Sequence, residues 1–447
     1  MSELARAFDS QWALLPFHHR FRAMSFSQMD HLSNLPDELL VTILSLLPTH
    51  IAARTSVLSR IFRHLWKASP SLLFITQDFP PPHDKNFIAM ADHALLHRHP
   101  SLPLLSLSLK SSSSSSSFLL DSYMPSLLAK ALSLGLRHLT IEGYLNLLPF
   151  LPTIFSIQSL ESLSLTSNFH FWSGQYYVFP SGFKMTFLRS LSLQLYTVDP
   201  ASLSRLVSEL CSLEDLYLHI YNMDKIRLSS QTIRKLELIS SYQKLDTVEL
   251  FLPSLESFHM TSCYSLSRLS HIRGKLPLLK RALVTLDGVH AEHISAVTGL
   301  LSCISHVEVL SLHVKENVVE IVKYPEPILL QAGKYMPNFP NLKHLDVGLF
   351  LHERNLEAIV MIFNNCPVLE SLKLIHKIPE FTLVRVSGRK KNRARGRKKK
   401  DRRSRLPHNA NGNCFYAYFR NLHLEENRKE FSKLLRKKCS YKRRAQN

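Results

Sequence analysis

The sequence predicts an α/β protein in which a short helical element is followed by a curved solenoid of leucine-rich repeats and a basic tail. Three features predict this organisation. A leucine motif recurs along residues 102–374, a proline-punctuated helical pattern occupies residues 30–74, and lysine and arginine crowd residues 388–447. We therefore expect a flexible leader over 1–29, the helical element over 30–74, the solenoid over 75–387 and a largely disordered tail over 388–447.

Composition limits the class of protein. The chain has 447 residues, of which 45% are hydrophobic, so it can bury a large core. The N-terminus lacks the basic start and apolar core of a secretory signal, and no run of about 18 apolar residues indicates a transmembrane helix. Its six cysteines are scattered without a C-x-x-C pair, which is typical of reduced thiols. We expect localisation in the nucleus and/or cytoplasm and no membrane partner.

Residues 30–74 carry the helical pattern. Pro36 fits the first turn of a helix, Asp37 and Glu38 complement its positive end, and Pro48 ends it. The apolar residues of this first helix form one stripe: Leu35, Leu39, Leu40, Ile43, Leu44 and Leu47. A second stripe follows: Ile51, Val57, Leu58, Ile61, Phe62, Leu65 and Trp66.

Two interpretations of these stripes remain open on periodicity alone. A segment of this size is too short to bury so much apolar surface by itself. The stripes therefore either cap the open end of the solenoid or enter a groove on another protein. Burial of each Leu or Ile would contribute about 1.5–3 kcal/mol in either case.

The solenoid is predicted from the motif L-x-x-L-x-L. Its last two apolar positions alternate with polar ones, as a short strand requires, and stacked units bury a continuous leucine core. The motif starts at eleven places: Leu102, Leu136, Leu160, Leu188, Leu213, Ile233, Leu255, Leu279, Val307, Leu342 and Leu369. Helical spacing at 119–134 and 356–363 predicts outer helices, and the serine run 111–117 predicts a flexible loop. Because the steps are irregular, an ordinary leucine-rich α/β domain remains the alternative.

The strand positions between the core leucines would line the concave face of the solenoid. We expect a substrate protein, which the sequence does not identify, to contact this face. The candidate residues are Thr140, Ser164, Ser192, Tyr217, Glu237, His259, Ser311, Asp346 and Lys373.

The net charge of +20 belongs to the tail. Residues 389–447 hold 22 lysines and arginines against 4 aspartates and glutamates, which leaves about +2 for the rest of the chain. Three interpretations stay open: a nuclear-import signal, a salt-dependent nucleic-acid contact, or a solvated tail without a role. The import candidates are Arg389, Lys390, Lys391, Arg397, Lys398, Lys399 and Lys400.

We find no pattern that indicates an enzyme. Gly-rich phosphate loops, G-x-S-x-G and H-E-x-x-H are all missing from the sequence. His290 and His293 form an isolated pair, which is more typical of surface packing than of a metal site, and Cys366 is expected to be a buried thiol. We therefore expect no catalytic residue, no cofactor and no metal.

Residues 30–74 resemble the F-box of plant F-box/leucine-rich-repeat (F-box/FBD/LRR-type) proteins. The matching residues are Asp30, Leu32, Leu35 to Leu40, Ile43 to Ser45, Leu47, Pro48, Thr55 to Ser59, Arg63, Leu65, Trp66 and Pro70. The resemblance implies a three-helix element that binds a Skp-type adaptor and, through it, a cullin and a RING subunit. It implies these adaptor-binding residues: Leu35, Pro36, Leu39, Leu40, Ile43, Leu44, Leu47, Pro48, Val57, Leu58 and Trp66.

The sequence departs from the family pattern at three points. The family usually has a basic residue and Trp where this chain has Ile61 and Phe62, and Lys where it has His50. We expect weakened rather than abolished docking from these changes. The basic tail does not match the further C-terminal module of many relatives, which an altered C-terminus would explain.

Two functions of different class follow. The first is the substrate-recognition subunit of an SCF-type (Skp-cullin-F-box) ubiquitin ligase, which catalyses nothing itself and holds a target near the conjugating enzyme. The second is a ligase-independent repeat scaffold or nucleic-acid-binding protein that acts through the basic tail.

Overall fold

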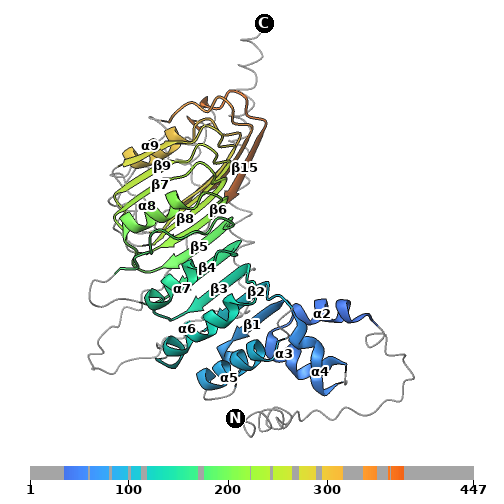
Figure 1. Ribbon diagram of the computed structural model, residues 1–447. Coiled ribbons are helices and arrows are strands. Elements are labelled where there is room, and N and C mark those ends of the chain that lie inside the picture. Colours follow the sequence, from blue (N-terminus) through green and yellow to red (C-terminus); the bar gives the residue numbers. More distant parts are fainter. Residues whose placement is uncertain are drawn as a thin grey trace, which may run out of the picture.

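The computed structural model is an elongated solenoid with a small helical element at its N-terminal end (Figure 1). The structure describes residues 35–58, 61–79, 83–98, 102–111, 118–169, 176–221, 223–241, 245–263, 271–287, 294–315, 336–349, 361–362 and 364–376. Several predictions lie outside these residues, namely the leader 1–29, most of the serine loop, the pair His290 and His293, and the tail with its import candidates.

Three short helices, with two 3-10 turns, form the N-terminal element: α2 (Asp37–Ser45), α3 (Thr49–Arg54) and α4 (Phe62–Leu65). Pro36 and Pro48 are the residues that precede α2 and α3, so each proline begins a helix whose first N–H groups need no internal partner. The predicted second helix is divided into α3 and α4, with a 3-10 turn at Thr55–Val57 after α3 and another at Trp66–Ala68 after α4. The predicted helical element is confirmed, with different internal boundaries.

One large parallel sheet forms the inner layer of the solenoid. Its strand order is β1-β2-β3-β4-β5-β6-β8-β10-β12-β13-β14-β15, and every neighbouring pair is parallel. The strands are β1 (Ser71–Ile75), β2 (Ser106–Lys110), β3 (His138–Gly143), β4 (Ser162–Ser167), β5 (Ser190–Leu195), β6 (Asp215–Ile220), β8 (Lys235–Ser241), β10 (Ser257–Cys263), β12 (Arg281–Asp287), β13 (Val309–Lys315), β14 (His344–Leu349) and β15 (Ser371–His376). The predicted α/β solenoid is confirmed.

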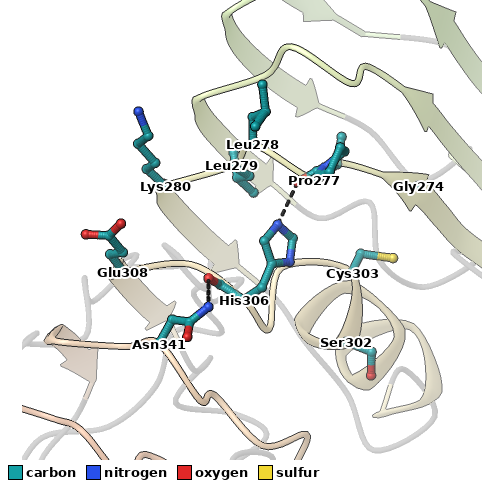
Figure 2. Close-up of a pocket in the computed structure, with 11 residues that line it drawn as sticks. Gly274, Pro277, Leu278, Leu279, Lys280, Ser302, Cys303, His306, Glu308 and Asn341 are labelled. Atoms are coloured by element: carbon teal, nitrogen blue, oxygen red, sulfur yellow. Dashed lines mark hydrogen bonds between the residues drawn. The ribbon is translucent and has the colours of Figure 1, made fainter.

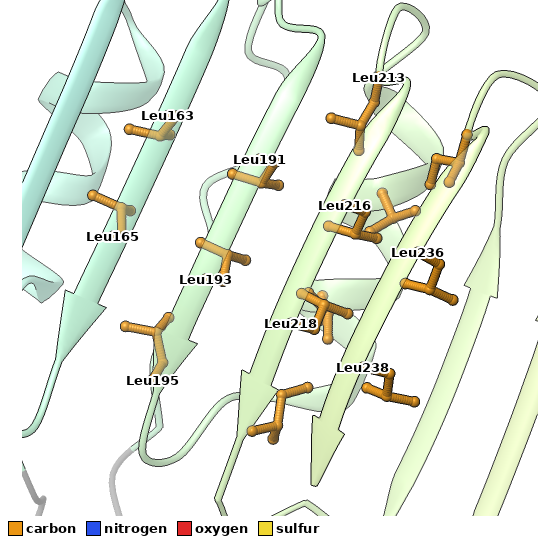
Figure 3. Packing of buried hydrophobic residues seen from close by; sticks show 14 of the residues in the cluster. Leu163, Leu165, Leu191, Leu193, Leu195, Leu213, Leu216, Leu218, Leu236 and Leu238 are labelled. Carbon is orange, nitrogen blue, oxygen red and sulfur yellow. The ribbon is translucent and has the colours of Figure 1, made fainter. Parts of the chain in front are cut away.

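The motif leucines form the core on one side of this sheet. In the unit that starts at Leu188, for example, Leu188, Leu191 and Leu193 are all buried, and the equivalent residues of the next strands stack beside them (Figure 3). Ten of the eleven predicted units follow this register. The first was misplaced by two residues, because Leu104 is buried and starts the motif, whereas Leu102 is exposed. Both positions carry leucine, so the motif alone does not distinguish them.

The strand β1 was not predicted as a repeat. Its unit has Ser69 at the first motif position, followed by Leu72 and Phe74, so the search for an apolar triplet misses it. Ser69 is nevertheless buried, and its hydroxyl bonds the carbonyl of Ser71 at 2.7 Å. The sheet therefore begins within the range 30–74 and is continuous with the helical element.

The outer layer consists of helices as far as α8, then of short strands, and then of a helix again at α9 (Figure 1). It contains α5 (His83–Leu96), α6 (Phe118–Leu132), α7 (Leu151–Phe155), α8 (Pro200–Glu209) and α9 (Ile294–Cys303), and a parallel sheet of β7 (Lys225–Ser229), β9 (Thr247–Phe251) and β11 (His271–Lys275). The predicted outer helix at 119–134 is confirmed as α6; that at 356–363 lies largely outside the described residues. Units of 20 to 24 residues, from Leu213 to Leu279, have room for a five-residue outer strand but little more.

A ladder of alternating charge runs along the strand starts. The residue after the first motif position is basic or acidic in strict alternation over ten units: Arg137, Glu161, Arg189, Glu214, Arg234, Glu256, Lys280, Glu308, Lys343 and Glu370. Each backbone N–H bonds the carbonyl of the preceding member at 2.8–3.0 Å. Side chains pair across repeats, as in Arg189–Glu214 at 3.1 Å. Each of these exposed pairs contributes little to stability. However, stacking a unit against the next unit but one would place like charges side by side along the whole ladder.

Candidate functional site

The helical element presents an apolar patch to solvent. Its exposed residues come from α2 and from the segment before α4: Leu39, Ile43, Leu46, Val57, Leu58 and Ile61. Leu46, Val57 and Leu58 are 80%, 74% and 77% exposed. We call these six residues the apolar patch. Soluble proteins rarely leave such a cluster open unless another molecule covers it.

The predicted adaptor-binding residues divide into two groups. Leu39, Ile43, Val57 and Leu58 lie in the apolar patch, and Pro36 is also exposed. The core-facing group consists of Leu40, Leu44 and Trp66, which are buried, with Leu35 and Leu47 packed against them and Pro48 half-buried. The core-facing residues support the patch from beneath and do not themselves offer surface to a partner.

The structure divides the apolar stripes between two sides of the same helices: one side packs in the core, and the entry of the other side into a partner's groove stays a prediction. Leu40, Leu44 and Phe62 belong to one continuous core with the strand leucines, as a solenoid cap requires. The other side of α2 stays open. Phe62 is 5% exposed, so its substitution for the family Trp changes the packing of the core and not the apolar patch.

Sequence reasoning did not assign Leu46 and Ile61 to the adaptor site. Leu46 lies between two helical positions of the stripe and is the residue after α2, where the chain turns outward. Ile61 was placed on the apolar side of the second pattern, but it is the residue before α4 and its side chain is exposed. Whether a residue at the end of a helix is exposed depends on the direction that the chain takes there. The spacing of apolar residues along the helix does not encode that direction.

Hydrogen bonds of two side chains, Thr49 and Arg98, fix the helical element to the solenoid. The Leu73 N–H of β1 donates to the Thr49 hydroxyl of α3 at 2.8 Å. The Arg98 guanidinium, 6% exposed, donates to the carbonyls of Ser69, Lys67 and Pro103 at 2.5, 3.2 and 2.9 Å. Burial without a carboxylate partner lowers the pKa of Arg98. Arg98 joins the last turn of the helical element to the loop that enters β2.

His50 lies at the same junction. Its imidazole packs on the Phe79 ring, with ring centroids 5.7 Å apart, and its Nδ1 is 3.3 Å from the Asp78 carboxylate. Burial lowers the pKa of His50, although Asp78 opposes the shift and Arg54 adds to it. The histidine thus occupies a packed, poorly hydrated position beside the Asp78 carboxylate.

The second candidate surface is the face of the large sheet opposite the outer layer, which we call the open face. All nine predicted substrate-face residues lie in one continuous row of register partners, which also includes Leu73, Ser108 and Leu283. Their side chains are adjacent from strand to strand because parallel register repeats every unit. The prediction that they share one face is confirmed; their role in substrate binding stays a prediction.

The chemistry of the open face changes at β6. From β2 to β5 most of its residues are small hydroxyl residues, which we call the hydroxyl floor: Ser106, Ser108, Thr140, Ser162, Ser164, Thr166, Ser190 and Ser192. Lys110, His138, Glu142 and Gln194 lie on the same face of these strands. At β6 the side chains become large, with Tyr217 and His219. The Tyr221 ring stacks on His219 and on Tyr196, with centroids 4.3 and 5.5 Å apart.

A cavity of about 710 Å³ lies elsewhere, beside α9 and the loop before β12 (Figure 2). The His306 imidazole bonds the Leu276 carbonyl at 2.6 Å, and Asn341 donates to the His306 carbonyl at 3.2 Å. Burial raises the pKa of the adjacent Cys303 thiol. The hydrogen bonds of His306 and Asn341 connect successive repeats, so a structural role accounts for the polar residues that line this cavity.

Within the described residues, no cluster of histidine, cysteine and carboxylate side chains is suited to a metal ion. No helix in the same residues is long and apolar enough to cross a membrane. Cys366 is 1% exposed, and burial raises its pKa to about 11, which keeps the thiol protonated.

Comparison with known proteins identifies both regions. A family model of the F-box domain matches residues 32–74, and a model described as FBD-associated F-box protein At5g56370, LRR repeats, matches residues 127–324. The chain is 27% identical over 384 residues to a putative F-box/FBD/LRR-repeat protein, At4g03220, of Arabidopsis thaliana, covering 78% of this chain and 74% of that protein. It is 26% identical over 381 residues to the FBD-associated F-box protein At4g10400 of the same plant, covering 82% and 88%.

Proposed function

We propose that this chain, which carries an F-box domain and leucine-rich repeats of the FBD-associated type, is the substrate-recognition subunit of an SCF-type ubiquitin ligase. The observation that carries the proposal is the apolar patch on the F-box, which stays open although its own core lies directly beneath it. The patch docks a Skp-type adaptor, and the open face of the repeats holds the target protein.

The apolar patch is suited to this role by its energetics. Transfer of a side chain such as Leu58 from solvent to a groove contributes about 1.5–3 kcal/mol when burial is complete. Scaled by their exposed fractions, the six residues offer about 5–11 kcal/mol, which is of the same size as the cost of association of about 4–15 kcal/mol that helix-in-groove recognition has to offset. Leu39 and Ile43 are four residues apart on α2, so both side chains enter a groove from one helix face.

The junction between the F-box and the repeats supports a positioning role. The Arg98 guanidinium and the Thr49 hydroxyl bond backbone groups on both sides of it, and one hydrophobic core runs through it. A target bound to the open face is thereby held at a fixed orientation to the adaptor. In this proposal the chain supplies proximity, and the catalytic groups belong to other subunits.

The proposal is tested by adaptor binding. Val57→Asp/Leu58→Asp places two charges in the groove-facing surface, and we expect it to abolish binding to a purified plant Skp-type adaptor while the circular dichroism spectrum is unchanged. Leu278→Asp is the matched control, because Leu278 is 56% exposed in the solenoid and should bind as wild type does. Equal binding by all three proteins, or no binding by the wild type, would refute the proposal.

We also propose nuclear and cytoplasmic localisation, on the basis of the Lys/Arg run of residues 388–406. A fluorescent fusion should lose nuclear accumulation when residues 388–447 are removed, with adaptor binding retained. Unchanged distribution of the shortened fusion would contradict an import role for the tail.

A further inference from the structure

We propose that the open face between β5 and β10 holds an arginine side chain of the target protein, with the Glu237 carboxylate as its counter-charge. The inference rests on the proposed function and deepens it, because it assigns a chemical feature to the substrate. Three observations support it: the position of Glu237 on the open face, its lack of a lysine or arginine partner among the described residues, and the aromatic rings beside it.

Glu237 lies at the centre of the row of register partners on the open face. Tyr217 of β6 pairs with it on one side and His259 of β10 on the other. Its side chain is 40% exposed, so it is accessible to a ligand. The hydroxyl floor begins one strand beyond Tyr217, and its small side chains allow a partner chain to approach the sheet closely.

The negative charge of Glu237 has no lysine or arginine within ion-pair distance among the described residues. Its contact is with the His259 Nδ1, at 3.1 Å. The His259 Nε2 lies 3.2 Å from the Thr261 hydroxyl. The contacts at both ring nitrogens orient the imidazole and, through it, the carboxylate. The carboxylate is thereby held in place without a lysine or arginine partner among the described residues.

Two other carboxylates of the open face, one on the neighbouring strand β6 and one on β3, differ in this respect. Asp215 is paired with Lys235 at 3.5 Å, and Glu142 with Lys110 at 2.9 Å. Glu237 is thus a carboxylate to which a ligand would bring the missing cation. Charge complementarity therefore favours a basic group over an acidic or phosphorylated one at this point.

The rings beside Glu237 favour arginine over lysine. Tyr217 is half-buried next to the carboxylate, and burial together with Glu237 and Tyr221 raises its pKa, so it stays a neutral phenol. The stack of Tyr196, Tyr221 and His219 adjoins it, and Gln194 donates to the Tyr221 hydroxyl at 3.0 Å. A planar guanidinium can lie on a tyrosine face and pair with a carboxylate at the same time, which an ammonium group does less well.

The geometry also sets the length of the segment. Strands β2 to β8 are successive neighbours at about 4.8 Å each, so the hydroxyl floor and Glu237 together extend over about 24 Å. An extended segment of about seven residues covers this distance. We therefore expect the target to lay such a segment across β2 to β5, with its arginine over β6 and β8.

The experiment selects from a display library of random peptides about ten residues long, with the full chain as bait. Wild type should enrich peptides with an arginine at one position, and replacing that arginine by glutamine should weaken binding at least about tenfold. Glu237→Gln should lose the enrichment and show no further loss with the glutamine peptide, which identifies the two groups as coupled. Tyr217→Ala should weaken binding, and Tyr217→Phe should retain it.

Glu142→Gln is the matched control, since it removes a carboxylate of the same face that Lys110 already neutralises. It should select the same peptides as wild type. Enrichment of acidic or phosphorylated peptides, no arginine enrichment by the wild type, or equal affinity of wild type and Glu237→Gln would overturn the inference. Adaptor binding of the same preparations is expected to be unaffected by Glu237→Gln, so failure of the arginine site is distinguishable from failure of the ligase role.

Discussion

Leu44→Ala and Leu46→Ala, two residues apart, are expected to have opposite effects on stability and on adaptor binding. Leu44 is 2% exposed and belongs to the core, whereas Leu46 is 80% exposed and belongs to the apolar patch. Truncation of a buried leucine costs about 2–5 kcal/mol, because the lost transfer free energy is increased by the cavity left behind. Truncation of an exposed one changes the free energy of unfolding by no more than about 0.5 kcal/mol.

The effects on binding should be reversed. Leu46→Ala removes most of one side chain from the proposed interface, which corresponds to about 1.5–2 kcal/mol and raises the dissociation constant for the adaptor about 10–30-fold. Leu44→Ala leaves the outer side of α2 unchanged, so the folded variant should bind within about threefold of wild type.

Urea unfolding followed by circular dichroism measures the first quantity, and titration calorimetry with the purified adaptor measures the second. Calorimetry is performed well below the unfolding midpoint of Leu44→Ala, so that both variants are folded. If Leu46→Ala binds as wild type does while folded Leu44→Ala does not, the division of α2 into a core side and a docking side is wrong.

Three further predictions concern the junction and the charge ladder. Arg98→Met should lower the free energy of unfolding by about 2–3 kcal/mol, because buried carbonyls lose their donor, and Arg98→Lys should lower it less; urea midpoints measure both. Stability should fall as the pH decreases through about 6.5, because burial lowers the pKa of folded His50 and the unfolded chain binds the proton more tightly; His50→Gln should reduce this dependence, and an identical pH profile would refute it. Arg234→Glu places like charges beside Glu214 and Glu256 and should cost about 0.5–1 kcal/mol at low salt, whereas an undiminished loss in 0.5 M salt, where we expect a Debye length of about 4 Å, would exclude an electrostatic cause.

Much of the fold could be predicted because the repeat is a local pattern. In a strand, alternate residues point to opposite faces, so the leucine spacing identified both the buried residues and the row from Thr140 to Lys373. Prediction failed where the pattern was ambiguous or degenerate. Leu102 and Leu104 both fit the motif, and Ser69 interrupted it, so the first strand was missed and the second was misplaced.

The candidate docking site was predicted only in part. The helical period indicated that one side of α2 is apolar, but not how much of that side the chain covers itself. Coverage depends on contacts of α2 with α3, α4 and the 3-10 turn after α4, which the helical period of α2 does not encode. As a result Leu40 and Leu44 became core while Leu46 and Ile61 became surface. Arg98 gave no sequence signal, since its partners are backbone carbonyls that any residue supplies.

The sequence by itself determined the repeat, its in-and-out alternation and the alternating charges at the strand starts, because each depends on positions within one unit or on the order of units. Only the tertiary structure decided which side of the F-box helices stays open, and that the Glu237 carboxylate contacts His259 and, among the described residues, no lysine or arginine. Both features depend on which elements pack against each other and how closely. The free energy of this packing comes from contacts between elements that are distant in the sequence, so no single segment encodes it.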